Sequence, residues 1–144
     1  NGGAAFYQIY RTEDGRFVTL SPLEAKFWAA FCTAVGRPDW IARQFEPLPQ
    51  TTLIGEVAEL FAAKPRAHWD ALLMPADCCY EPVWACAEVP EHPQVEARGL
   101  IHRRDGMVEV LFPAYVDGRP PPTPTDPVDG RVSDVLATWE ATTP

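Results

Sequence analysis

The stretch FYQIYRTEDGRFVTLSPLEAKFW, residues 6–28, contains two strand signals, a turn signal and a helix start in close succession. Aromatic and β-branched residues, which strands prefer, dominate residues 6–10 and again Phe17–Leu20. Asp14-Gly15 lies between them, and this pair is the strongest short-range hairpin signal because glycine adopts a positive φ freely. The stretch therefore predicts an antiparallel β-hairpin followed directly by a helix.

The helix start carries a polar signature. Ser21 is placed to cap the helix, Pro22 to occupy its first position and Glu24 its third, as in a capping box. A carboxylate would then be fixed at a helix N-terminus directly after a strand. Two interpretations of Glu24 stay open: plain capping, or the edge of an active site.

Apolar periodicity along the rest of the chain predicts further elements. The expected helices cover residues 23–35, a stretch from Thr52 to Lys64-Pro65, residues 66–74 and residues 133–139. The other expected elements are a strand over residues 77–83, two helical turns within residues 88–99, and a second hairpin of residues 100–102 and 107–112. This order predicts an α+β fold of antiparallel hairpins packed against several short helices. It argues against a parallel nucleotide-binding sheet.

Sixteen prolines in 144 residues are roughly twice the usual ~5%, and five of them fall within residues 119–127. That run is expected to be extended polyproline II, as a strap over a surface or a linker; a ligand for a proline-binding module is the functional alternative. We therefore predict a small domain over residues 1–115, a proline-rich strap over residues 116–131, and a C-terminal helix and tail over residues 132–144.

The net charge of −8 argues against binding to nucleic acid or to an anionic membrane surface, because both need clustered Lys and Arg. No apolar run approaches the ~20 residues of a spanning helix, and the first residues do not form a signal peptide. A cytoplasmic location is expected.

Cys32, Cys78, Cys79 and Cys86 are expected to be reduced thiols, mostly buried, without a metal ion. A zinc site made from Cys78 or Cys79 with Cys86 and a histidine is the alternative. It lacks the two closely spaced ligand pairs that structural zinc sites usually show.

No phosphate loop, GxGxxG, HExxH or GxSxG motif occurs, so Glu24 is the leading candidate for chemistry. The histidines are weaker: His68 is expected at the surface, His92 in a turn entering a helix, and His102 on a strand. Arg103 and Arg104 could meet a phosphate group, although a solvated hairpin tip beside Asp105 explains them more simply.

Several motifs resemble the family III CoA-transferases, most closely their α-methylacyl-CoA racemase branch. The specific block is GGAAFY at residues 2–7, YRT at 10–12, DG at 14–15 and LEAKFW at 23–28. Shorter matches follow at Asp77-Cys78, at Pro82-Val83 and in HPQVEARG at residues 92–99, and the likeness weakens after Tyr115.

The resemblance implies that this chain is the C-terminal segment of a longer acyl-CoA enzyme. It implies that the acyl-CoA domain and main catalytic residues lie upstream, that CoA enters as part of the substrate with no separate cofactor, and that the full-length protein is an interlocked homodimer. Glu24 would orient a catalytic histidine outside this chain. Tyr7 and Leu23 would border the acyl pocket, with ordinary core packing as the alternative.

Ser21-Pro22 stands where the family usually has Gly-Ala, and Ala25 replaces its usual proline. The acyl group and the reaction therefore stay open. The intact protein is expected to exchange the α-proton of 2-methylacyl-CoA thioesters; CoA transfer between carboxylic acids through an upstream aspartyl anhydride is the alternative. A third possibility is a non-catalytic interaction domain. The chain alone is expected to be inactive.

Overall fold

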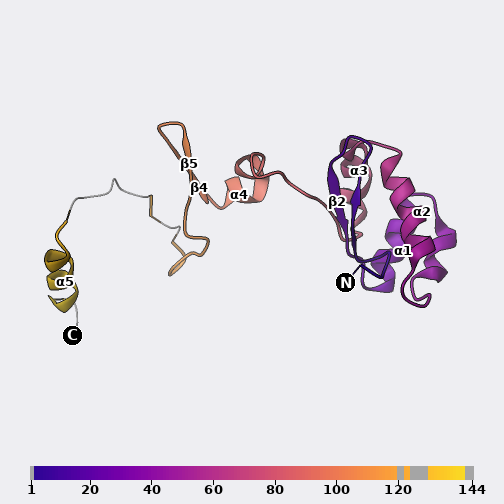
Figure 1. The fold of residues 1–144 in the computed structure, drawn as a ribbon, viewed down its shortest axis with the longest axis horizontal. Helices are drawn as coiled ribbons and strands as arrows, with labels where there is room; N and C mark the ends of the chain where they lie inside the picture. Colours follow the sequence, from indigo (N-terminus) through magenta and orange to yellow (C-terminus); the bar gives the residue numbers. More distant parts are fainter. Residues whose placement is uncertain (1, 120–121, 124–129, 142–144) are drawn as a thin grey trace. The chain divides into compact units, whose positions relative to one another are not determined.

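The computed structural model describes residues 2–119, 122–123 and 130–141, and it divides into two compact units, Asn1–Ala85 and Cys86–Pro144 (Figure 1). The first unit contains β1 (Gln8–Arg11), β2 (Phe17–Leu20), α1 (Ala25–Ala34), η1 (Pro38–Arg43), α2 (Thr51–Ala62), α3 (Arg66–Leu73), η2 (Met74–Ala76) and β3 (Tyr80–Pro82). The second contains η3 (Val89–Glu91), α4 (Pro93–Ala97), β4 (Ile101–Arg104), β5 (Met107–Val110) and α5 (Val132–Ala141). The predicted α+β class is confirmed.

The first unit is built on an antiparallel sheet in the order β1-β2-β3. The predicted hairpin is present, with Tyr10 opposite Val18. In its turn, Gly15 N donates to Thr12 O over 3.0 Å and Gly15 has φ +76°, the left-handed conformation that suits glycine. Thr12 N donates to Arg16 O over 2.9 Å and closes the loop.

The predicted capping box at Ser21 is wrong, because α1 begins at Ala25 with Glu24 as its N-cap residue. Ser21 is instead tied to the residue that precedes β3: Ser21 N donates to Cys79 O over 3.0 Å. This bond extends the β2–β3 pairing to Ser21, and α1 begins at Ala25, after the predicted first position at Pro22. The C-terminal end of α1 agrees with the helix predicted over residues 23–35, since α1 stops before Gly36, whose φ is +72°.

Strand β3 is shorter than the predicted residues 77–83. Asp77 and Cys79 have φ of +48° and +53°, which no strand residue adopts, so pairing with β2 begins at Tyr80. The helix predicted over residues 66–74 ends at Leu73, and a 3₁₀ turn containing Pro75 follows. The helix predicted from Thr52 is α2, which starts one residue earlier.

Phe61 of α2 lies at the centre of the core and is fully buried. Its ring centroid lies 5.2 Å from that of Tyr10 and 6.0 Å from that of Phe31. It lies 5.2 Å from the Trp69 ring and 6.4 Å from the Tyr80 ring. One side chain of α2 thus contacts β1, α1, α3 and β3, and Figure 1 shows α1 and α2 on the same side of the sheet.

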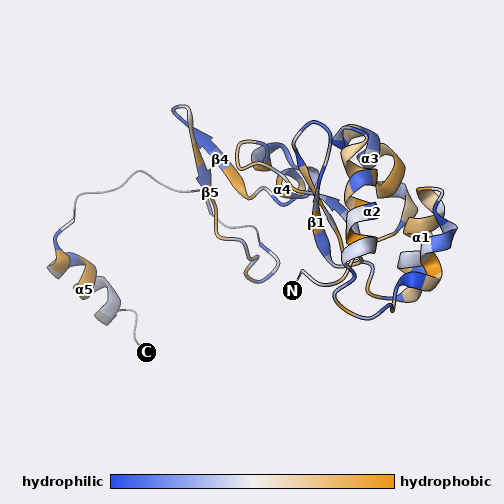
Figure 2. Cartoon of the chain, turned by 45° about the vertical axis from the view of Figure 1, so that its right-hand side comes forward, coloured by the Kyte–Doolittle hydropathy of each residue, from blue (hydrophilic) through white to orange (hydrophobic). Residues whose placement is uncertain are grey.

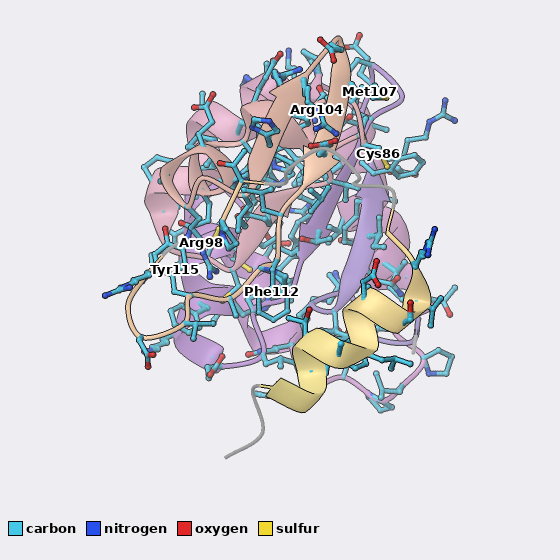
Figure 3. The ribbon with its side chains drawn as sticks, turned by 90° about the vertical axis from the view of Figure 1, so that its left-hand side faces the viewer. Cys86, Arg98, Arg104, Met107, Phe112 and Tyr115 are labelled. Atoms are coloured by element: carbon cyan, nitrogen blue, oxygen red, sulfur yellow. The ribbon has the colours of Figure 1, made fainter. Side chains whose placement is uncertain are left out.

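The second unit contains the predicted second hairpin, β4 paired with β5. Arg104 of β4 forms a 2.8 Å ion pair with Glu109 of β5. Arg98 Nη2 donates to Pro113 O over 2.9 Å, and Tyr115 OH donates to Arg98 O over 3.1 Å (Figure 3). These polar contacts hold the segment after β5 against the end of α4.

Apolar burial contributes little to this second unit, because none of residues 86–119 is buried. Met107 and Val110 are 58% and 76% exposed, and Figure 2 shows hydrophobic stretches on both strands. A two-stranded hairpin is only marginally stable by itself, so these elements depend on hydrogen bonds and ion pairs rather than on a core.

Helix α5 (Val132–Ala141) matches the predicted C-terminal helix. Half of the predicted proline-rich strap, residues 120–121 and 124–129, lies outside the described residues. Val116 and Arg119, at its start, bond to each other across a turn in which Asp117 and Gly118 have positive φ. The domain boundaries at residues 115 and 131 stay predictions. Among the described helices, none is long and apolar enough to cross a membrane.

Replacing the central aromatic ring tests this account of the core. Phe61→Ala should lower the free energy of unfolding of the first unit by about 3–5 kcal/mol, the range for deleting a buried aromatic side chain. Phe17→Ala, at a position 46% exposed, should change it by less than about 0.5 kcal/mol. Urea unfolding followed by tryptophan fluorescence measures both. Equal shifts in the two variants would contradict the central role of Phe61.

Candidate active-site edge

Two adjoining surface hollows lie at one end of the sheet in the first unit. The strand hollow, of about 430 Å³, is lined by Gly2, Tyr7, Gln8, Ile9, Thr19, Leu20 and Ser21. The loop hollow, of about 410 Å³, is lined by Gly3, Ala4, Phe6, Tyr7, Leu23 and Leu48. Tyr7 is common to both, and the loop hollow is lined by apolar side chains apart from the Tyr7 hydroxyl.

Tyr7 is held at this end by a turn that precedes β1, in which Tyr7 N donates to Ala4 O over 3.2 Å. The buried hydroxyl of Tyr10 donates to Ala5 O over 2.7 Å and anchors the same turn to the core. Tyr7 itself is 48% exposed. Core packing within this unit therefore does not account for its position.

Leu23 lies on the short connection between β2 and α1. Gln44 Nε2 donates to Pro22 O over 3.2 Å and to Leu23 O over 3.1 Å, which fixes the backbone of this connection. The Leu23 side chain stays 56% exposed and lines the loop hollow beside Tyr7. The structure thus brings together the two residues predicted to border an acyl pocket.

Glu24 follows at the N-terminus of α1, and it lines neither hollow. Its carbonyl accepts from Phe27 N and Trp28 N, while its side chain makes no capping hydrogen bond. The carboxylate is exposed and has no hydrogen bond or ion pair with the described residues. The positive end of the α1 dipole favours a negative charge there. Glu24 can therefore accept a hydrogen bond from a group outside this unit.

The weaker candidates have structural roles or no assigned role. His68 is exposed, as predicted, and its ring meets the edge of Trp69 at 4.9 Å. His92 is the N-cap of α4, its Nδ1 accepting from Gln94 N over 3.1 Å, which confirms the predicted turn entering a helix. His102 is half-buried on β4. Arg103 is exposed, whereas Arg104 is engaged by Glu109.

All four cysteines are free thiols: Cys32 and Cys78 are buried, Cys79 is half-buried and Cys86 is exposed. Burial raises the pKa of the Cys32 thiol to about 12 and that of Cys78 to about 11. Burial, and then the Glu24 carboxylate, raise the pKa of Cys79. Across the described part of the chain, no group of three or more His, Cys, Asp or Glu side chains could hold a metal ion.

Sequence patterns gave no sign of Leu48, Gln44 or Gln50 in this region. Leu48 lies in an irregular, proline-flanked loop where no periodicity marks a buried or lining position. Gln44 and Gln50 are buried polar residues, and only their tertiary hydrogen bonds reveal a role. The sequence does not indicate which glutamines are buried, because glutamine is usually exposed.

Comparison with known proteins places the chain in a class. The sequence profile of CoA-transferase family III matches residues 1–127. The chain therefore belongs to CoA-transferase family III.

Two particular relatives are α-methylacyl-CoA racemases. The Homo sapiens enzyme is 31% identical over 100 residues, which cover 69% of this chain and 26% of the racemase. The Mus musculus enzyme is 26% identical over 135 residues, covering 93% of this chain and 35% of the racemase. The matches thus span about a quarter to a third of the lengths of these relatives.

Solved structures share the fold. A hypothetical protein (Rv3272) from Mycobacterium tuberculosis matches with a TM-score of 0.66 and 22% identity, covering 83% of this chain and 37% of that one. A CAIB/BAIF family protein from Brucella suis matches with a TM-score of 0.65 and 17% identity, covering 98% of this chain and 38% of that one. At these identities the likeness concerns the fold.

The burial of the thiols predicts their reactivity. Under native conditions at pH 7–8, exposed Cys86 should react fast with a thiol reagent, whereas buried Cys32 and Cys78 should react slowly, because burial holds both thiols protonated. Denaturation without reductant should release four titratable thiols, and elemental analysis should find no stoichiometric zinc. Fewer thiols, or one zinc per chain, would contradict the prediction of metal-free reduced cysteines.

Proposed function

We propose that the full-length protein is an acyl-CoA enzyme that exchanges the α-proton of 2-methylacyl-CoA thioesters, and that this chain is its C-terminal segment. The segment would cover the acyl-CoA domain and complete the active site. One observation carries the proposal: the Glu24 carboxylate has no partner among the described residues and directly follows Leu23 of the loop hollow. The 31% identity with the human racemase indicates which reaction to test first.

The reaction needs a base, an acid and a place for negative charge. One base removes the α-proton, the electron pair of the broken C–H bond moves into the thioester as an enolate, and an acid returns a proton to the opposite face. Glu24 would accept a hydrogen bond from the N–H of a histidine outside this chain. A carboxylate in that position fixes the tautomer of the imidazole and raises its basicity.

The loop hollow suits the other end of the substrate. Phe6, Leu23 and Leu48 offer apolar surface, and the Tyr7 ring adds an aromatic wall. Burying the methylene groups of an acyl chain there is favourable by about 0.8 kcal/mol for each group. Tyr7 and Leu23 would therefore bind the acyl part, while CoA enters as part of the substrate and no separate cofactor is needed.

The setting of the enzyme belongs to the same proposal. We place the full-length protein in the cytoplasm as a homodimer that binds acyl-CoA and neither nucleic acid nor a membrane surface. The net charge of −8 supports the absence of a polyanionic partner.

The test uses the full-length protein with 2-methylacyl-CoA in deuterated water. Loss of the α-proton signal by NMR, faster than in buffer, supports the proposal. CoA transfer to a second carboxylic acid without α-exchange would favour the transferase reaction through an upstream aspartyl anhydride. If neither reaction is observed, the remaining interpretation is a non-catalytic interaction domain.

The chain of residues 1–144 alone should be inactive in the same assay, because the base, the acid and the acyl-CoA domain are expected upstream. The control is buffer containing an equal concentration of an unrelated protein. α-Proton exchange clearly above this control would show that a base within the chain suffices. It would contradict the proposal that the catalytic base and acid lie upstream.

The substitution Glu24→Gln separates catalysis from helix capping. The Glu24 side chain makes no capping bond, so the melting temperature should barely move. If Glu24 orients a histidine, loss of its charge lowers the pKa of that histidine, and kcat should fall tenfold or more, about 1.4 kcal/mol per decade. The limb of the pH–rate profile that reports the histidine should move to lower pH.

Glu59→Gln is the matched control, since Glu59 is an exposed carboxylate on α2 that lines neither hollow. Its kcat and pH profile should equal those of the parent. A Glu24→Gln enzyme as active as the parent would remove Glu24 from the mechanism.

A further inference from the structure

Two buried glutamines join three separate segments of the first unit. Gln44 and Gln50 are 2% and 3% exposed. A buried side-chain amide must satisfy two donors and an acceptor. The side-chain hydrogen bonds of both glutamines go to backbone groups, several of them distant in the sequence, so these side chains act as tethers between loops.

Gln50 tethers the start of the chain to the loop that precedes α2. Gln50 Oε1 accepts from Ala5 N over 2.9 Å, and Gln50 N donates to Gly3 O over 2.8 Å. Its Nε2 donates to Gln44 O over 2.7 Å and to Glu46 O over 3.1 Å. The loop after Gln44, which carries Leu48, is therefore fixed relative to Gly3–Ala5 by two hydrogen bonds of one residue, one through the Gln50 main-chain N–H and one through its side-chain oxygen.

Gln44 continues the connection to the third segment through its bonds to Pro22 O and Leu23 O. A series of hydrogen bonds thus runs from Ala5 through Gln50 and Gln44 to Leu23. The segments that it joins carry most of the residues lining the loop hollow.

Apolar burial does not fix the position of Leu48 at this hollow. Leu48 is 66% exposed and Phe45 is 75% exposed, so little hydrophobic free energy holds the loop. Further contacts of the loop include an Arg43–Glu46 ion pair of 2.8 Å and an edge contact between the Phe6 and Phe45 rings at 6.4 Å. Neither of these contacts reaches Leu23, whereas the side chains of the two glutamines bond to Ala5 N, Pro22 O and Leu23 O.

We propose that Gln50, acting through Gln44, is a positioning residue that sets the spacing between Leu23 and Leu48 and thereby the fit of the acyl group. This inference rests on the proposed function. Gln50 does not line the hollow, so its effect would be on geometry rather than on contact with the substrate.

The test compares two variants of the full-length protein. Gln50→Met keeps the side-chain length and removes every side-chain hydrogen bond. Thr12→Val is the control: Thr12 is equally buried at 2% exposed, but its hydroxyl bonds Asp14 and the Arg16 carbonyl in the turn at the other end of the hairpin. Misplaced binding groups typically lower rates by up to about a hundredfold. We expect Gln50→Met to raise KM for 2-methylacyl-CoA about tenfold or more, and Thr12→Val to leave KM within about twofold.

A second measurement does not need turnover. In protein with labelled leucine methyl groups, the NMR resonances of Leu23 and Leu48 should shift in Gln50→Met and stay in place in Thr12→Val. If the parent protein shows no α-exchange, the proposed function fails, and the methyl resonances alone decide the positioning role.

Unmoved Leu23 and Leu48 resonances, or equal effects of the two variants, would overturn the proposal. If Gln50→Met does not fold, Gln44→Met replaces it, because it removes only the bonds to Pro22 and Leu23. That variant should shift the Leu23 resonance and leave that of Leu48; an unmoved Leu23 resonance would overturn the proposal equally.

Discussion

The packing of Phe61 against four aromatic neighbours is the constraint on which the first unit depends. Its contacts with Tyr10, Phe31, Trp69 and Tyr80 join two strands and two other helices to α2. Each aromatic pair contributes about 0.5–1.5 kcal/mol beyond the burial of its area. Because one ring contacts two strands and two other helices, a shift of any of these elements would disrupt its packing. This rigidity fixes the end of the sheet at which Tyr7 and Leu23 lie.

The candidate site uses a different kind of interaction from the core. Its lining side chains are exposed, and hydrogen bonds from buried glutamines and from Tyr10 hold their backbones. Hydrogen bonds to backbone groups define direction and spacing more closely than apolar contacts do. Such a surface can therefore stay exposed while its shape is kept, as the proposed contact with a substrate and another domain would require. Glu24 fits this arrangement, since its backbone begins a helix and its carboxylate is left without a partner in the described chain.

The second unit has helical turns and a hairpin without any buried residue over 86–119. Its local order comes from short-range devices: the His92 cap, the Arg104–Glu109 pair and the contacts between Arg98 and Tyr115. The sequence predicted these elements well, because hairpins around Asp105-Gly106 and helices beginning at proline are decided locally. Because these patterns involve only neighbouring residues, they do not indicate whether another surface covers the exposed apolar side chains of the second unit.

The sequence by itself determined the α+β class, the first hairpin, most helices and the family, because apolar periodicity, glycine turns and specific motifs are properties of short segments. It also indicated Glu24, through the helix-start pattern and the resemblance together, and Tyr7 and Leu23, through the resemblance alone. Only the tertiary structure decided that Ser21 bonds to Cys79 instead of capping α1, so that the helix starts at Ala25 and the Glu24 side chain is left uncapped. Only the tertiary structure brought Leu48 and Leu23 into the lining of one hollow. The physical reason is the same in both cases: hydrogen bonds between residues some 20 to 60 positions apart outweigh local preference, and no local pattern records them.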